Sequence, residues 1–382
     1  MNHNPSTRLR IVEAEAYQQN ILSGVSRTFA LTIPQLPTAL RSVVTNAYLL
    51  CRIADTIEDE PAISAAQKAV LHEWFLAVLK GEEKAQDFAE GVTPRLSDAT
   101  LPDERELMAN TSLIVSYTHS LAKPQQEVLV KCVNIMCRGM GRYQDNASLK
   151  GLKDLNEVDC YCYHVAGVVG EMLTDLFCQY SSQVNERRTE MLALAPSFGE
   201  GLQLTNILKD LWDDRQHGVC WLPYEEFREF GVELTGMAPG RSDKAFAAAL
   251  RYMIGIAHAH LRNAFLYTLA IPPQEVGIRR FCLWAIGLAV LTLWRIGAHP
   301  AYSSGRQVKV SRRIVRATII GTSLTARHDW MLKLLFSGVT TGLPFTQLPR
   351  LDPQLSAWVT KSTLDGGSRV ASGSQLLRDV DK

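Results

Sequence analysis

The 382-residue sequence lacks several features that would place it in other classes of protein. It has no convincing β-strand pattern, no internal repeat and no GxGxxG after a strand, so a Rossmann nucleotide-binding unit is not expected. The longest apolar run, from Phe281 to Trp294, is too short to span a bilayer and predicts a buried helix. The net charge of +1 argues against a bulk electrostatic partner such as nucleic acid.

The cysteines form no pattern of their own. Eight of them without a recognisable signal peptide favour reduced thiols in a cytoplasmic protein. Cys160 and Cys162 flank a tyrosine, and no second pair at zinc-ligand spacing matches them, so we expect core thiols.

Apolar residues recur at helical spacing along most of the chain, and with 46% apolar content they can bury a large core. We expect an all-α protein with a flexible N-terminus over residues 1–8, one helical domain over 9–345 and a loose tail over 346–382. The expected helices lie at about 8–22, 38–60, 64–80, 104–121, 124–144, 155–181, 184–214, 243–270, 274–297 and 309–337. The longest polar connections lie at 82–103 and 230–243.

The stretch from Gly201 to Pro223 concentrates polar side chains on one face of a helix. Gln203, Asn206, Asp210 and Asp214 follow one another at spacings of three, four and four, while leucines occupy much of the remaining surface. A carboxylate pair at i,i+4 costs about 0.2 to 0.5 kcal/mol even in water. Mg²⁺ compensates such a pair, since it takes oxygen ligands and commonly bridges carboxylates to a phosphate. A solvated acidic face is the alternative.

A second acidic cluster repeats this arrangement far away in the chain. Asp55, Glu58 and Asp59 lie in CRIADTIEDE at the end of a long apolar helical run. If the two helices face each other, their carboxylates can hold magnesium ions that grip a diphosphate from both sides.

Other polar residues gain interest beside these clusters. Ser26 and Arg27 lie at a chain break, where an arginine and a hydroxyl can bind phosphate, and Arg52 shares a helix face with Asp55. Tyr161 and His164 are polar tips on an otherwise apolar helix. The alternatives are a surface arginine and a core histidine.

At these residues the chain resembles the squalene and phytoene synthase family, the head-to-head prenyl transferases. The matching pieces are SRTFAL at 26–31, YLLCRIADTIEDE at 48–60, YCYHVAGVVG at 161–170, QLTNILKDLWDD at 203–214, FCLWAIGLAVLTL at 281–293 and QVKVSRR at 307–313. They cover nearly the whole chain in the family's order, and DTIEDE is more similar to the squalene synthases. The resemblance implies a single-domain isoprenoid synthase fold, a class I terpenoid synthase helical bundle around a central cavity.

The resemblance also implies roles for individual residues. The magnesium and diphosphate carboxylates are Asp55, Asp59, Asp210 and Asp214, and Glu58 and Asn206 complete the metal-ligand set. Ser26, Arg27, Tyr48 and Arg52 match diphosphate contacts. Tyr161, Gln203 and Asn206 match the reacting end of the cavity, and Phe29, Val165, Ala166, Leu173 and Phe281 match its apolar wall.

Two departures from the family pattern concern phosphate binding. Many members carry an arginine directly after Gly218, where this chain has Val219, and Lys209 stands where arginine is commoner. Either Arg215 substitutes for the missing arginine, or the diphosphate is held differently.

The implied reaction joins two farnesyl diphosphates through presqualene diphosphate, with Mg²⁺, and reduces the product to squalene with NADPH. Tyr161 or the released diphosphate would take the proton. The alternatives are a sibling that makes presqualene diphosphate, dehydrosqualene or phytoene, an unrelated metal-dependent phosphohydrolase, and a non-catalytic helical interaction protein.

A basic segment is the candidate for cofactor and membrane contact. Arg306, Lys309, Arg313 and Arg316 would form one stripe if helical, with Arg312 on the adjoining face. In the resembling family Lys309 matches a lysine near the reductive site, and we expect Lys309 and Arg312 to bind the phosphates of NADPH. A solvated or membrane-facing basic surface is the alternative. We expect a monomer that touches the membrane peripherally.

Overall fold

The structure is a computed structural model that describes residues 5–144, 148–240 and 243–348. Within these ranges the chain forms helices and no named strand, and an isolated bridge pairs Leu152 with Pro223. The all-helical prediction is therefore confirmed. The described residues fall into two compact units, unit 1 over 5–144 and unit 2 over 148–348. The expectation of one domain over 9–345 stays a prediction, and the expected loose tail over 346–382 lies, from residue 349 on, outside the described residues.

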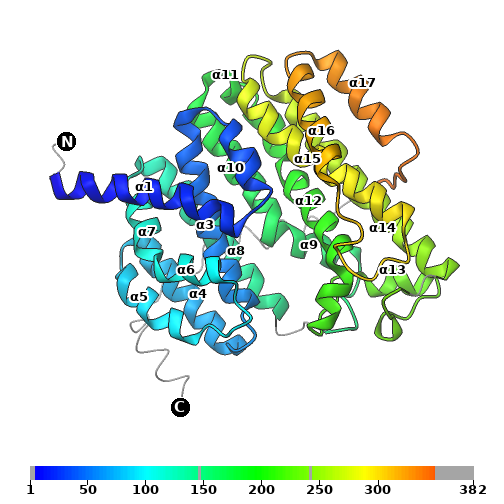
Figure 1. Cartoon of the computed structure of the whole chain (residues 1–382), viewed down its shortest axis with the longest axis horizontal. Coiled ribbons are helices and arrows are strands. Elements are labelled where there is room, and N and C mark those ends of the chain that lie inside the picture. The colour runs from blue at the N-terminus through cyan, green and yellow to red at the C-terminus, as the bar shows by residue number, and fades with distance from the viewer. Residues whose placement is uncertain (1–4, 145–147, 241–242, 349–382) are drawn as a thin grey trace. The chain divides into compact units, whose positions relative to one another are not determined.

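Unit 1 is organised around α3, the helix that carries the first acidic cluster. It packs against α1, α7 and α8 (Figure 1). Its helices are α1 Pro5–Val25, α2 Phe29–Thr32, the 3₁₀ turn Ile33–Gln35, α3 Thr38–Asp59, α4 Ala65–Lys80, α5 Ala85–Val92, the 3₁₀ turn Thr93–Arg95, α6 Pro102–Ala109, α7 Thr111–Ser120 and α8 Lys123–Gln144.

Unit 2 is organised around α12, which carries the second acidic cluster and lies beside α14, α10 and α15 (Figure 1). Its helices are α9 Leu155–Cys162, the π turn Tyr163–Gly167, α10 Val168–Tyr180, α11 Ser182–Asn185, α12 Arg188–Gln216, α13 Tyr224–Glu229, the 3₁₀ turn Leu234–Gly236, α14 Lys244–Ala270, α15 Val276–Ala298, α16 Arg312–Thr325 and α17 Asp329–Thr340. Cys160 and Cys162 are buried free thiols, as expected.

The single helix expected over 309–337 is wrong, because the chain breaks between α16 and α17. The Ser311 hydroxyl accepts a hydrogen bond from Ile314 N and caps the N-terminus of α16, which therefore begins at Arg312. At the break, the buried guanidinium of Arg279 donates to Ala326 O and to the Asp329 carboxylate. A contact from α15 therefore fixes a break that helical periodicity does not reveal.

Short helices, among them α5 and α13, lie where the sequence predicted none. α5 falls within the expected polar stretch 82–103, and α13 follows Pro223. In α5, Phe88 and Val92 are fully buried although the surrounding residues are polar. Helices of six to eight residues give too few turns for periodicity to be recognised, so packing decides them.

The apolar run from Phe281 to Trp294 lies in α15, a core helix of unit 2 as expected. The whole helix has 23 residues and is, among the described residues, the one helix long and apolar enough to cross a membrane by length and composition. The expectation that this segment is too short to span a bilayer considered the apolar run alone and not the whole helix. Because 56% of its most apolar window is buried in the protein and it packs against α12, α14 and α16, the core-helix interpretation is the better supported one.

Gly199 sets how closely α12 approaches the π turn. A Cβ atom at this position would lie 1.9 Å from Ala166 O, a backbone atom that cannot rotate away. The close approach therefore requires glycine.

We expect Gly199→Ala to lower the free energy of unfolding by about 2 kcal/mol or more, because α12 must move away from the π turn. The matched control is Gly321→Ala in α16, where an added Cβ meets nothing within 4 Å. There the same change should stabilise by about 0.5 to 1 kcal/mol. Urea denaturation measures both, and equal effects of the two changes would contradict the close-packing argument.

Candidate functional site

The first acidic cluster lies at the C-terminal end of α3, as the spacing predicted. Asp55 is half-buried, with 31% of its side chain exposed, and Asp59 is exposed. Arg52 Nη1 lies 3.8 Å from Asp55 Oδ2, and the same guanidinium pairs with Glu104 of α6. One arginine thus serves two carboxylates.

Burial raises the pKa of Asp55 above its usual range; Arg52 opposes this shift, and Asp59 and Glu104 add to it. Arg52 is thus shared between carboxylates, and Lys68 of α4 lies near Glu58 and Asp59. Several carboxylate oxygens gathered in this way are hard donors of the kind that fit a bound Mg²⁺. Asp55 and Asp59, with half-buried Glu58, are the residues of unit 1 that could hold it.

The chain break before α2 brings three of the expected substrate-binding residues together. The Tyr48 hydroxyl donates to Val25 O at 3.1 Å, and its ring centroid lies 4.9 Å from that of Phe29. Phe29 N in turn donates to Ser26 Oγ at 3.0 Å. Burial raises the pKa of Tyr48, which keeps its proton available for donation. Arg27 is exposed at the same turn.

Glu60 anchors the loop that follows α3. Its buried carboxylate accepts hydrogen bonds from Ala62 N and Ser97 N, both at 2.9 Å, and from the Thr100 hydroxyl. Burial alone would raise the pKa of Glu60, but the hydrogen bonds from Ser97, Thr100 and Ala62 outweigh it and lower the pKa to about 2. The end of the acidic helix is thereby fixed.

We expect Glu60→Gln to destabilise the protein by about 1 to 3 kcal/mol at pH 7, because an amide replaces the charged acceptor. A lowered carboxyl pKa adds stability above the unfolded value near 4.5, and this stability is lost as pH falls toward 2. The difference between wild type and variant should therefore shrink from pH 6 to pH 3. Thermal melting across this range measures it, and a constant difference would contradict the charged role of Glu60.

The second acidic cluster lies in the last turns of α12. Lys209 Nζ lies 3.0 Å from Asp210 Oδ2 and donates to Asn206 Oδ1 at 3.1 Å. Burial raises the pKa of Asp210, Lys209 lowers it, and Asp213 raises it further. Gly305 approaches so closely that a Cβ there would lie 2.6 Å from Asp210 Oδ1. Asn206, Asp210 and half-buried Asp214 offer oxygen donors of the same kind as those in unit 1.

The guanidinium of Arg215 is turned toward the backbone of a neighbouring loop. Its Nη2 donates to Met237 O at 3.1 Å and lies 3.5 Å from Thr235 O. The guanidinium thus ties the end of α12 to the loop 235–237. The sequence left two possibilities open: either Arg215 substitutes for the missing arginine, or the diphosphate is bound without such an arginine. This geometry favours the second.

The expected lining residues lie on α9, the π turn and neighbouring helices. Tyr161 stacks on Trp221, with ring centroids 4.2 Å apart and planes at 7°. The other residues of this group are half-buried Val165, Ala166 and Gln203, and buried Leu173 and Phe281. The sequence did not single out Trp221; its only signal is an aromatic residue shortly after the second acidic motif.

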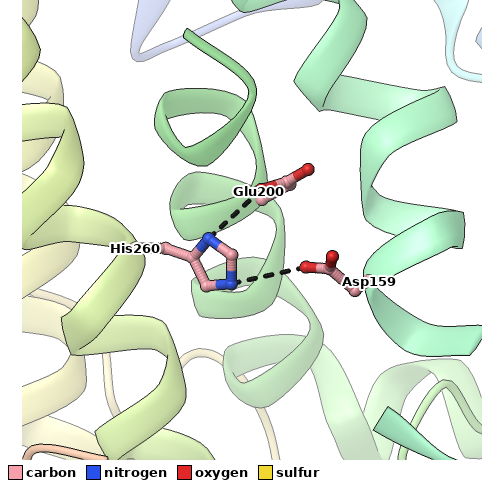
Figure 2. Close-up of side chains that lie close together, drawn as sticks. All are labelled: Asp159, Glu200 and His260. Carbon is pink, nitrogen blue, oxygen red and sulfur yellow. Dashed lines mark ion pairs between the residues drawn. The ribbon is translucent and has the colours of Figure 1, made fainter. Parts of the chain in front are cut away.

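A buried cluster of titratable groups was missed by the sequence analysis. Figure 2 shows Asp159 of α9, Glu200 of α12 and His260 of α14, with His260 between the two carboxylates. The sequence carried only a weak signal for this cluster, namely a charged residue, Glu200, in an apolar helical stretch. Such a residue indicates a buried or functional group only when its spatial neighbours are known.

The basic segment does not form the single helical stripe that its spacing suggested. Arg306 and Lys309 precede α16, whereas Arg312, Arg313 and Arg316 lie within it. Lys309 and Arg312 are both exposed. Two exposed cations do not by themselves make a nucleotide site.

Comparison with known proteins adds three findings. A family model described as squalene/phytoene synthase matches residues 22–313. Among curated relatives, squalene synthase ERG9 of Gibberella zeae is 29% identical over 294 residues, which cover 76% of this chain and 60% of the relative. Squalene synthase ERG9 of Saccharomyces cerevisiae is 29% identical over 277 residues, which cover 72% and 59%. The chain thus spans about three fifths of the length of these relatives.

Solved structures show the same fold. One described as the complex of TcSQS with the ligand BPH1237 has a TM-score of 0.66 at 21% identity and covers 96% of this chain and 99% of its own. A dehydrosqualene synthase in complex with a ligand has a TM-score of 0.58 at 23% identity and covers 82% and 96%. These likenesses confirm the expected all-helical isoprenoid synthase fold.

Proposed function

Since the chain belongs to the squalene/phytoene synthase family, we propose that it condenses two farnesyl diphosphates head to head through presqualene diphosphate and reduces the product to squalene. The observation that carries this proposal is the repeated carboxylate pair. Asp55 and Asp59 end α3, Asp210 and Asp214 end α12, and buried apolar residues occupy the other faces of both helices. The relatives' names favour squalene as the product.

Mg²⁺ suits both clusters because their donors are carboxylate and amide oxygens. Asp55, Glu58 and Asp59 would hold it in unit 1, and Asn206, Asp210 and Asp214 in unit 2. When bound, it would stabilise negative charge on a leaving diphosphate. Gly305 packs against this cluster, since a Cβ there would meet Asp210 Oδ1 and its N–H donates to Asp213 Oδ2 at 3.1 Å.

The chain's own residues would then act on the substrate. Ser26, Tyr48 and Arg52 supply a hydroxyl, a phenol and a guanidinium that can bind diphosphate oxygens from the same end of unit 1. An allylic cation survives only where water is excluded, and an aromatic face beside it, such as that of Phe29 in unit 1, would contribute about 0.5 to 2 kcal/mol of cation-π stabilisation. Tyr161 is the candidate to take the proton lost from the coupled cation.

The reductive step has less support from the residues present. Lys309 and Arg312 can bind phosphates, but nothing in the described residues is built around them as a nucleotide site. The condensation is therefore assigned to named residues. The reduction is tested by adding NADPH to the assay.

We expect Asp55→Asn and Asp210→Asn each to reduce Mg²⁺-dependent pyrophosphate release from farnesyl diphosphate by a thousandfold or more, while melting temperatures hold or rise. The fold survives because the change removes repulsion between like charges. Asp87→Asn, at an exposed position in α5, is the matched control and should retain full activity. Full turnover in either cluster variant would overturn the metal assignment.

Product analysis separates the alternatives. The purified protein is incubated with farnesyl diphosphate and Mg²⁺, with and without NADPH, and the hydrocarbons are identified by mass. Squalene formed only with NADPH, with presqualene diphosphate accumulating without it, supports the proposal. Dehydrosqualene regardless of NADPH, or turnover only with geranylgeranyl diphosphate, indicates a sibling enzyme. Orthophosphate or a monophosphate product indicates a phosphohydrolase.

We also propose that the protein contacts the membrane peripherally through α16 and α17, since its product is insoluble in water. Arg313, Arg316, Ile320 and Leu324 share one face of α16, and Ile320 and Leu324 are 60% and 73% exposed. Trp330 on α17 is 67% exposed. Between residues 306 and 340 the chain has seven arginines and lysines against one acid, which itself pairs with Arg279. Exposed apolar groups beside excess positive charge fit an anionic lipid surface.

We expect flotation with phosphatidylglycerol-containing vesicles at low salt and weaker flotation with phosphatidylcholine alone. Arg313→Glu with Arg316→Glu should abolish the preference for anionic lipid, since each cation near such a surface contributes about 1 kcal/mol. Leu101→Ser, which removes an apolar residue that is 58% exposed in unit 1, is the control. If wild type stays unbound in both vesicle types, membrane contact through this face is excluded.

A further inference from the structure

The Asp159, Glu200 and His260 side chains meet where α9, α12 and α14 pack together (Figure 2). His260 Nε2 lies 3.4 Å from Asp159 Oδ1, and His260 Nδ1 lies 3.2 Å from Glu200 Oε2. All three residues are less than 10% exposed. They form a buried line of carboxyl, imidazole and carboxyl.

This line lies directly against the π turn. If Gly167 carried a Cβ, that atom would lie 3.2 Å from Glu200 Oε1. Asp159 is in the same short helix as Tyr161, and the π turn that follows carries Val165 and Ala166. π turns within helices often occur at functional sites. The cluster is thus joined, through α9 and the π turn, to residues assigned above to the reacting end.

The charge of the cluster must be balanced within it. No lysine or arginine of the described residues forms an ion pair with Asp159 or Glu200. Two carboxylates in such a buried place do not both stay ionised, so the group takes up either protons or a cation. Protons fit the geometry better, because His260 turns a different nitrogen toward each carboxylate and a single metal ion can use only one of them.

The pKa directions agree with shared protons. Burial raises the pKa of Glu200 to about 8, with Glu171 adding to the shift. Burial raises the pKa of Asp159 to about 7, with Glu200 adding and His260 opposing. Burial lowers the pKa of His260, and Asp159 opposes that shift. A neutral imidazole therefore accepts a hydrogen bond from one protonated carboxyl group at its bare nitrogen and donates its N–H to the other carboxyl group.

The remaining polar and titratable neighbours come from each packed element. Cys160 and Cys162 are on α9, Tyr163 and His164 on the π turn, and Glu171 on α10. The Ser197 hydroxyl of α12 lies 3.2 Å from His260 Nδ1 and accepts a hydrogen bond from Asn263 Nδ2 of α14 at 3.1 Å. These groups bring no permanent positive charge that would replace the shared protons.

We propose that Asp159, His260 and Glu200 act as one proton-sharing unit that positions α9 and the π turn, and with them Tyr161, for the reaction. The three are positioning residues, since they act through Tyr161 and the turn. The positioning role rests on the proposed function, whereas the sharing of protons does not.

A pair of substitutions at one position tests the unit. Glu200→Gln keeps a group that donates to His260 Nδ1, as the protonated carboxyl does, and should retain kcat within about threefold. Glu200→Met has similar volume and no donor, and should lower kcat tenfold or more while KM changes less than threefold. His260→Gln should lower kcat similarly. Glu190→Gln, an exposed site on the same helix, is the control and should leave kcat unchanged.

Stability against pH tests the shared protons without any substrate. A carboxyl whose folded pKa is raised stabilises the fold at low pH, and this stability is lost as pH rises through that pKa. Wild type should therefore melt progressively lower from pH 6 to pH 9, and Glu200→Gln should melt higher relative to wild type at pH 9 than at pH 6. In the active enzyme, the alkaline fall of kcat should move to higher pH in Glu200→Gln.

The outcomes separate the two proposals. If wild type releases no pyrophosphate from farnesyl diphosphate, the proposed function fails, and melting against pH still decides whether the protons are shared. Equal kcat in the Gln and Met variants overturns the positioning role. A melting difference that does not change with pH overturns proton sharing. One equivalent of bound metal in wild type, measured by elemental analysis and lost in His260→Gln, would show a metal site instead.

Discussion

Carboxylates on helices that also pack into a core are the constraint on which this structure depends. A helix such as α3 or α12 gains its stability from its buried apolar face, and that burial also removes water from acidic groups at the edge of the face. The consequence appears in the raised pKa values of Asp55 and Asp210. Cations lie beside both clusters: Arg52 and Lys68 in unit 1 and Lys209 in unit 2. Arg52 and Lys209 are each shared with a second acceptor.

The surroundings of these carboxylates differ from those of a carboxylate with a structural role. Glu60 shows the structural case, because backbone and hydroxyl donors from the loop 97–100 and from Ala62 satisfy it and lower its pKa. Asp55 lies one turn away and has no such set of donors around it. Two acids at the end of the same helix thus differ in role because of what surrounds them.

The buried cluster in unit 2 shows a third way to compensate carboxylates. Asp159 and Glu200 are buried, and no arginine or lysine in the described part of the chain pairs with them, so protons held with His260 take the place of a cation. This arrangement requires α9, α12 and α14 to meet closely, which Gly199 assists by letting α12 approach the π turn. The packing that places Val165 and Ala166 on the π turn therefore also creates the titratable group beside them.

The sequence by itself determined the all-helical class, the long helices and the acidic faces, because each depends on residues three or four apart within one segment. Asp55 with Asp59 and Asp210 with Asp214 could be placed in this way. Tertiary packing decided the rest: the break between α16 and α17, which Arg279 holds from α15; the turning of Arg215 toward the loop 235–237; and the joining of Asp159, Glu200 and His260. These features could not be predicted because their partners lie 20 to 101 residues apart in the sequence, and periodicity carries no information about which distant segments meet.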